Sequence, residues 1–316
     1  MLQSGQIGLK ELFGIDSPII QGGMAHISNG AFAAAVSEAG ALGTIATAAR
    51  DGAYVREQIK EARKLTKRPF SVNIMLANPF CKEVVTAVLD EGVSIVATGA
   101  GSPALYMKDF LANGCKVIAV VPHVRAALKV EELGVSAVVA EGGESGGHIG
   151  PVSTMVLVPM VVEAVRIPVI AAGGIADGKG FMAALALGAL GVQMGTAFIA
   201  TKECPVHQSY KDRILAAAET DTVVTGLGTK EPVRGLRNQL TDNYFEMLRK
   251  LASEEELFKP LTGSLSRAAA GDMETGSIQA GQITGMLREI KTVRQVIEDV
   301  MSGAEQVLQR MKKTEI

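Results

Sequence analysis

The chain alternates between short apolar runs and longer amphipathic stretches over residues 1–200. The apolar runs are rich in β-branched residues and lie at residues 18–22, 41–46, 70–76, 94–99, 116–121, 137–140, 168–172 and 191–194. The stretches between them carry apolar residues at helical spacing and lie at residues 31–38, 55–65, 82–91, 103–112, 125–132, 155–165 and 179–187. Strict alternation predicts parallel strands joined by right-handed crossovers. Eight such units match barrel closure, so we predict an α/β fold, a (β/α)8 TIM barrel, over residues 1–200.

The pattern changes after Phe198. Residues 201–285 have a mainly helical pattern with a loop at residues 225–230, and we expect a helical lid or substrate subdomain there. Residues 286–316 contain one apolar stripe at helical spacing, made of Ile290, Val293, Ile297, Val300, Ala304, Val307, Leu308 and Met311. The stripe predicts a long final helix that packs back on the barrel wall.

The composition narrows the class of protein. Of the 316 residues 47% are hydrophobic and 35 are glycine, which is typical of parallel strands covered on both faces. The formal charge of −2 gives no reason to expect nucleic acid or an anionic membrane as a partner. No apolar run approaches the ~20 residues of a membrane-spanning helix, and residues 1–10 lack a signal-peptide core. Cys81, Cys115 and Cys204 are far apart and indicate neither disulfides nor a metal site, so we expect a cytoplasmic protein.

Glycines follow the seventh and eighth predicted strands, at the barrel end where active sites of this fold lie. The seventh strand runs through Ala172 into Gly173 and Gly174, and the eighth ends with residues 193–196, Gln193, Met194, Gly195 and Thr196. Glycine lets backbone amides approach an anion closely, and the N-terminus of the next helix adds unpaired donors. These glycines would also suit tight turns alone, but two such loops at these strands favour a phosphate site.

Residues 99–104 match the sequence pattern G-x-G-x-x-A of dinucleotide-binding loops, but the surrounding pattern differs from that of such a fold. The match follows the fourth strand of a barrel without the two-domain context of a dinucleotide fold. We interpret it as a structural turn.

One histidine lies in a glycine-rich loop after the sixth strand. The segment runs from Glu141 to Gly150 and contains Ser145, Gly146, Gly147 and His148. A histidine at the barrel mouth with little neighbouring bulk suits an acid or base that meets a substrate. An isolated histidine is otherwise most often structural, and this setting favours the catalytic interpretation.

Five segments together resemble the nitronate monooxygenase superfamily: residues 21–24, 72–73, 140–150, 171–178 and 193–196. Within that group Glu141, residues 234–239 and residues 276–282 resemble the flavin-dependent enoyl-acyl-carrier-protein reductases. The resemblance covers nearly the whole chain. His26, where relatives often carry an aromatic residue, and Gly143, where methionine is common, depart from the pattern and leave the acyl-chain preference open.

The resemblance implies FMN as cofactor and NADH or NADPH as co-substrate. It places Gly23, Met24 and Asn73 along the flavin ring and Glu141 beside it, and it makes His148 the catalytic residue. It adds to the cofactor-binding residues Gly22, Ser145, Gly146 and Gly147. It places Gly173, Gly174, Gly195 and Thr196 around the flavin phosphate, with Gln193 nearby, and it counts Ala172 and Met194 among the cofactor-binding residues. It further implies an acyl carrier protein as partner, a homodimer and stimulation by a monovalent cation, with no bound metal in the site.

Three other functions use the same features. A nitronate monooxygenase would use the histidine to deprotonate a nitroalkane, and the Glu141 form of the loop argues against it. A quinone reductase would need no acyl partner. A flavin-binding regulator or storage module would leave His148 without a purpose.

Overall fold

The structure is a computed structural model that describes residues 7–229 and 231–313. Its main sheet has eight parallel strands, as the apolar runs predict. The strands are β1 (Ile19–Gln21), β2 (Gly43–Ala46), β3 (Phe70–Met75), β4 (Ile95–Gly99), β5 (Lys116–Val121), β6 (Ala137–Glu141), β8 (Val169–Ala172) and β9 (Gly191–Met194). Their order is β1-β9-β8-β6-β5-β4-β3-β2.

The sheet closes into a barrel between β1 and the start of β2. The Gln21 amide donates to the Leu42 carbonyl and the Leu42 amide to the Ile19 carbonyl, both at 2.9 Å. Inside the barrel, Ile20, Ile118 and other strand residues pack together. A short helix that the sequence pattern did not predict, α1 (Leu9–Phe13), adds Leu9 and Phe13 to this interior cluster.

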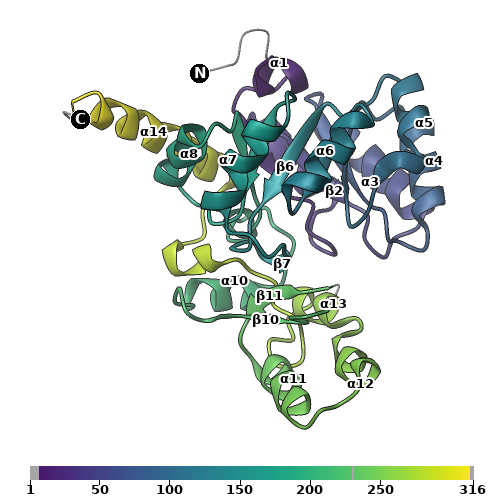
Figure 1. Ribbon diagram of the computed structural model, residues 1–316, viewed down its shortest axis with the longest axis vertical. Coiled ribbons are helices and arrows are strands. Elements are labelled where there is room, and N and C mark those ends of the chain that lie inside the picture. Colours follow the sequence, from purple (N-terminus) through teal and green to yellow (C-terminus); the bar gives the residue numbers. More distant parts are fainter. Residues whose placement is uncertain (1–6, 230, 314–316) are drawn as a thin grey trace.

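Helices surround the strands in the predicted alternation (Figure 1). They are α2 (Gly30–Glu38), α3 (Gly52–Leu65), α4 (Cys81–Asp90), α5 (Met107–Ala112), α6 (Val124–Glu132), α7 (Thr154–Ala164) and α8 (Gly178–Ala186), with a 3₁₀ turn η1 (Pro103–Leu105) before α5. Their inward faces form one large apolar cluster with the outward faces of the strands. The predicted TIM barrel is confirmed.

Residues 201–285, here called the appended segment, lie on one side of the barrel (Figure 1). After α9 (Thr196–Ile199), it contains the helices α10 (Gln208–Leu215), α11 (Gln239–Arg249), α12 (Glu254–Phe258), η2 (Lys259–Leu261) and α13 (Ser264–Ala269), and η3 (Gln282–Met286) crosses its end. Two strands, β10 (Thr222–Thr225) and β11 (Val233–Leu236), flank the predicted loop and form an antiparallel hairpin that the sequence analysis did not predict. The Thr-Val-Val-Thr run of β10 has strand propensity, but four residues are too few to show alternation.

The predicted final helix is α14 (Val293–Met311), which packs mainly against α8 and returns the chain to the barrel wall (Figure 1). Its stripe is buried from Val293 to Ala304, whereas Leu308 and Met311 are exposed. The close approach depends on Gly178 at the start of α8, because a Cβ there would lie 2.2 Å from the Ala304 nitrogen.

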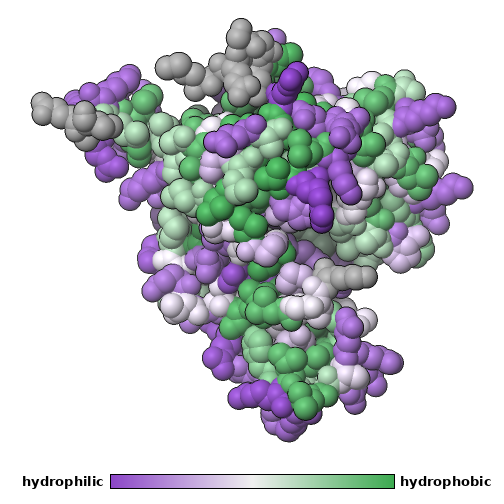
Figure 2. All heavy atoms as spheres, in the orientation of Figure 1, coloured by the Kyte–Doolittle hydropathy of each residue, from purple (hydrophilic) through white to green (hydrophobic). Residues whose placement is uncertain are grey.

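The outer face of α7 is apolar as well. Met155, Val156 and Met160 are exposed there, and Figure 2 shows hydrophobic residues gathered where Figure 1 places α7. Exposed apolar patches of this kind are typical of contact surfaces.

Among the described residues, no helix combines the length and apolar character needed to cross a membrane.

We predict that Gly178→Ala lowers the free energy of unfolding by about 1–3 kcal/mol, because the added methyl group would overpack the contact of α8 with α14. Gly180→Ala on the same helix is the matched control. Its Cβ would meet Ile175 at an ordinary 3.4 Å, so helix propensity should make it neutral or stabilising by up to ~1 kcal/mol. Urea denaturation measures both, and equal stability of the two variants would contradict the predicted packing.

Candidate active site

A cavity of about 570 Å³ lies at the carboxyl ends of the barrel strands and is closed by the appended segment. Its volume is in the range of small-molecule and cofactor sites. Every residue predicted for the site, from Gly22 to Thr196 and including His148, lines this cavity. The structure therefore brings the predicted residues together, and their individual roles stay predictions.

The two glycine loops form one wall. Gly173 and Gly174 have φ angles of +98° and +71°, a left-handed conformation that favours glycine. The amides of Gly174 and Ile175 donate no hydrogen bond within the described part of the chain. Free amides beside glycines suit an anionic group such as a phosphate.

The N-terminus of α8 does not supply the free donors expected from the sequence. The Asp177 carboxylate accepts hydrogen bonds from the amides of Lys179 at 3.0 Å and Gly180 at 2.9 Å. Asp177 is therefore an N-cap that uses these donors itself. An anion at this wall would depend on the loop amides before Asp177.

Asn73 and Gly23 meet at the opposite wall. The Asn73 side-chain nitrogen donates to the Gly23 carbonyl at 3.3 Å, and any Cβ at position 23 would lie 2.0 Å from that nitrogen. The Asn73 oxygen is buried and has no partner among the described residues. A buried acceptor without a partner is costly, so this atom fits a ligand that donates a hydrogen bond.

The histidine loop is held by the appended segment. Gly147 and His148 form a short strand, β7, which pairs with β11 so that His148 lies opposite Val233 and Gly147 opposite Arg234. Gly146 fits against the backbone of Ala280, where a Cβ would come within 2.6 Å of the carbonyl carbon. The His148 side chain is exposed to the cavity and makes no hydrogen bond to a described residue, which leaves the ring available to a ligand.

Two charged side chains fix the base of this loop. Arg234 Nε donates to the Gly143 carbonyl, and its Nη1 donates to the Thr222 hydroxyl, both at 3.0 Å. The Glu144 carboxylate accepts from the Thr154 amide at 2.9 Å and the Thr154 hydroxyl at 2.8 Å. The loop is therefore joined both to the hairpin and to the start of α7.

Glu141 lies at the end of β6, on the cavity wall. Burial raises the pKa of its carboxyl to about 7, and a hydrogen bond with Ser145 opposes this rise. The carboxyl group can therefore change its charge near neutral pH.

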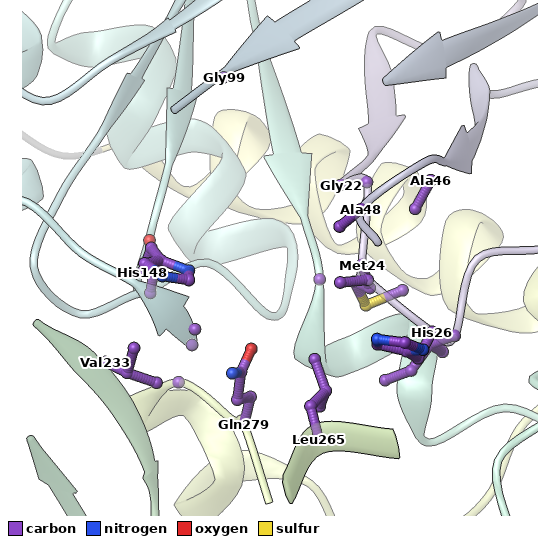
Figure 3. A pocket seen from close by; sticks show the side chains of 18 of the residues that line it. Gly22, Met24, His26, Ala46, Ala48, Gly99, His148, Val233, Leu265 and Gln279 are labelled. Carbon is purple, nitrogen blue, oxygen red and sulfur yellow. The ribbon is translucent and has the colours of Figure 1, made fainter. Parts of the chain in front are cut away.

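The structure adds residues that the sequence analysis did not assign to the site. Val233 and Gln279 close the cavity from the appended segment on the side of His148, and Leu265 closes it nearer Met24 (Figure 3). His26 lines the cavity on the side of Met24 and was noted in the sequence only as a departure from relatives. Of these added residues only Gln279 lies in a segment that the sequence analysis had named, residues 276–282, and the resemblance of that segment gave Gln279 no role.

The described residues of this site offer an imidazole and polar groups for an anionic ligand. Within residues 7–229 and 231–313, no three His, Cys, Asp or Glu side chains come together as metal ligands. The cavity combines an anion wall, a buried amide acceptor and an open imidazole. Such a combination suits a phosphorylated cofactor that reacts next to a proton donor.

Comparison with known proteins now gives the family. The family model described as nitronate monooxygenase matches residues 7–85 and 78–303. The chain belongs to the nitronate monooxygenase family. A member named probable nitronate monooxygenase, from Staphylococcus saprophyticus, is 31% identical, with 95% of this chain and 98% of that protein covered.

Two further comparisons concern a second relative and a solved structure. A relative from Rhodococcus jostii, named (3aS,4S,5R,7aS)-5-hydroxy-7a-methyl-1-oxo-octahydro-1H-indene-4-carboxyl-CoA dehydrogenase, is 31% identical over 94% of this chain and 95% of its own. The solved structure of FabK from Thermotoga maritima has a TM-score of 0.94 and 45% identity over 96% of this chain and 97% of that chain. The resemblance to enoyl-acyl-carrier-protein reductases within the family is confirmed.

We predict that Glu141→Gln changes stability in a pH-dependent way. The folded-state pKa of about 7 exceeds the ordinary 4.5, so the folded protein binds the extra proton between these values and loses stability as pH rises through this window. The glutamine variant lacks this loss. Its free energy of unfolding should equal that of the wild type at pH 4.5 and exceed it by about 1–3 kcal/mol at pH 8.

Urea denaturation at the two pH values, at equal cofactor occupancy, measures this difference. A stability difference that is the same at both pH values would contradict the raised pKa.

Proposed function

We propose that the protein is an FMN-dependent reductase of the 2,3 double bond of trans-2-enoyl thioesters, with NADH or NADPH as reductant and acyl carrier protein as substrate carrier. The observation that carries the proposal is the single cavity in which both glycine loops, Asn73 and His148 meet, in a chain 45% identical to FabK. The CoA thioester in the name of the Rhodococcus relative supports a thioester substrate.

The residues of the cavity fit FMN. The loop amides at Gly173 and Gly174, together with Gly195 and Thr196, would hold the phosphate. The unpaired oxygen of Asn73 would accept from the ring, and Gly23, which has no side chain, leaves the space that the Asn73 side chain occupies. When bound, FMN supplies the hydride chemistry between the nicotinamide and the enoyl β-carbon.

His148 is the residue of the protein that would assist the chemical step. Hydride addition at the β-carbon leaves negative charge on the thioester oxygen and the α-carbon, and this charge must be stabilised and a proton supplied. The imidazole of His148 is open to the cavity, while its backbone is fixed by β11. A positioned donor of this kind suits both tasks.

Nicotinamide and enoyl substrate would use the same cavity in turn. The described residues form a barrel and an appended segment without a separate dinucleotide-binding domain. Ping-pong kinetics follow from such sharing. The homodimer and stimulation by a monovalent cation are part of the same proposal and rest on the resemblance. The cytoplasmic location is also part of it and rests on the cysteine pattern.

The second candidate is a nitronate monooxygenase, which the family description and the name of the Staphylococcus relative favour. In that reaction His148 would remove a proton from a nitroalkane instead of donating one. A quinone reductase would use the same reduced cofactor with another acceptor.

We predict that the purified protein releases FMN, not FAD, on denaturation, because the glycine loops form a site for one phosphate. Under anaerobic conditions NADH or NADPH should bleach the flavin absorbance. Crotonyl thioester should restore it at least tenfold faster than a quinone or air. Stopped-flow absorbance measures each reoxidation. Bleaching of the oxidised flavin by a nitronate, with recovery in air, would assign the second function instead, and faster reoxidation by the quinone would assign the third.

We predict that His148→Ala separates the two half-reactions. FMN should stay bound, because other strands hold it, and bleaching by the nicotinamide should persist, because it needs no proton from the protein. Reoxidation by the enoyl thioester should slow by ~10²–10⁴-fold. His207→Ala, at an exposed position outside the cavity, is the control. Equal losses in both half-reactions would instead give His148 a role in binding.

A further inference from the structure

His26 lies on the cavity wall across from His148 (Figure 3). Its backbone has φ of +60°, a left-handed conformation that is uncommon outside glycine but enriched in histidine. The turn is fixed by Ser28, whose hydroxyl accepts from the Met24 amide at 3.2 Å and from the Gln21 side-chain nitrogen at 3.0 Å. The strained position is therefore held by the surrounding structure.

Arg50 determines which ring nitrogen of His26 carries the proton. Arg50 Nη2 lies 3.4 Å from His26 Nδ1. A guanidinium can only donate, so Nδ1 must be the acceptor and the proton must be on Nε2. Burial, and next the charge of Arg50, lower the pKa of His26, which favours the neutral ring.

Arg50 is itself held in place. Its guanidinium lies 4.5 Å from the ring centroid of Tyr54. The Asn78 side chain donates to the carbonyls of Thr47 at 2.9 Å and Arg50 at 2.8 Å, which fixes the loop that carries Arg50. The tautomer of His26 is thus set by a chain of fixed groups.

The Nε2 hydrogen of His26 has no partner within the described part of the protein. The wall nearby is apolar, with Met24, Ala46, Ala48 and Leu265 (Figure 3). Beside these side chains an ionic group would lose far more hydration free energy than an uncharged planar carbonyl. A neutral donor in an apolar wall therefore suits a carbonyl oxygen.

Resting on the proposed function, we infer that His26 is a binding residue whose Nε2 donates a hydrogen bond to a carbonyl oxygen conjugated to the carbon that exchanges hydride. Two ligands of the reaction carry such an oxygen, the nicotinamide carboxamide and the acyl thioester. Arg50 is a positioning residue that acts through His26.

Binding of unreactive ligands tests this inference and separates the two sources. Titration calorimetry on the flavin-loaded protein would use NAD⁺ and NADP⁺ in one arm and butyryl-pantetheine in the other. His26→Phe keeps an aromatic ring and removes the donor, so affinity in one arm should fall about 2- to 10-fold while the other arm is unchanged. His207→Phe, outside the cavity, should change neither arm.

A double-mutant cycle tests the role of Arg50. Arg50→Met should weaken the same arm as His26→Phe and have no further effect in the His26→Phe background. Nitrogen-15 NMR of the histidine rings measures the tautomer in the absence of ligand, and the fraction of His26 rings protonated on Nε2 should fall in Arg50→Met.

The inference is overturned if His26→Phe leaves the affinity in both arms unchanged or lowers it equally in both. It is overturned as well if neither ligand binds the wild-type protein. It is also overturned if the wild-type ring is protonated on Nδ1. If NAD⁺ or NADP⁺ binds and butyryl-pantetheine does not, the result counts against the proposed enoyl substrate. The role of His26 is then still tested by the nicotinamide arm and by the NMR spectrum.

Discussion

The pairing of β7 with β11 is the constraint on which the site depends. The loop around His148 is rich in glycine and has little preference for one conformation. The ladder that places His148 opposite Val233, together with the bond from Arg234 to the Gly143 carbonyl, gives the loop a fixed path. Because β11 belongs to the appended segment, the barrel alone leaves the histidine unplaced.

The appended segment also completes the cavity, and the contact between the two parts is close. Gly146 fits against the Ala280 backbone, and the Gly281 amide donates to the Thr196 hydroxyl at 2.9 Å. That bond ties the end of β9, where a phosphate is expected, to the same segment that holds the histidine. Movement of the segment would therefore affect both ends of the site, since one set of contacts serves both.

The sequence predicts the barrel well because its strands are buried on both faces and read as continuous β-branched runs. The site residues at strand ends follow from the same alternation, since carboxyl ends of parallel strands meet at one edge. The hairpin was missed because β10 is four residues long and β11 pairs with a loop distant in the sequence. The capping by Asp177, and the places of His26 and Gln279, depend on tertiary contacts that periodicity does not report.

Two histidines line one cavity in different surroundings, and the surroundings divide their tasks. His26 has one nitrogen occupied by Arg50, which favours a neutral ring with a fixed donor. His148 has no side-chain partner in the described structure and only its backbone is fixed. Proton transfer needs a group that can gain and lose a proton, whereas recognition of a carbonyl oxygen needs a donor that keeps it. The environments therefore support the proposed division, with proton transfer by His148 and recognition by His26.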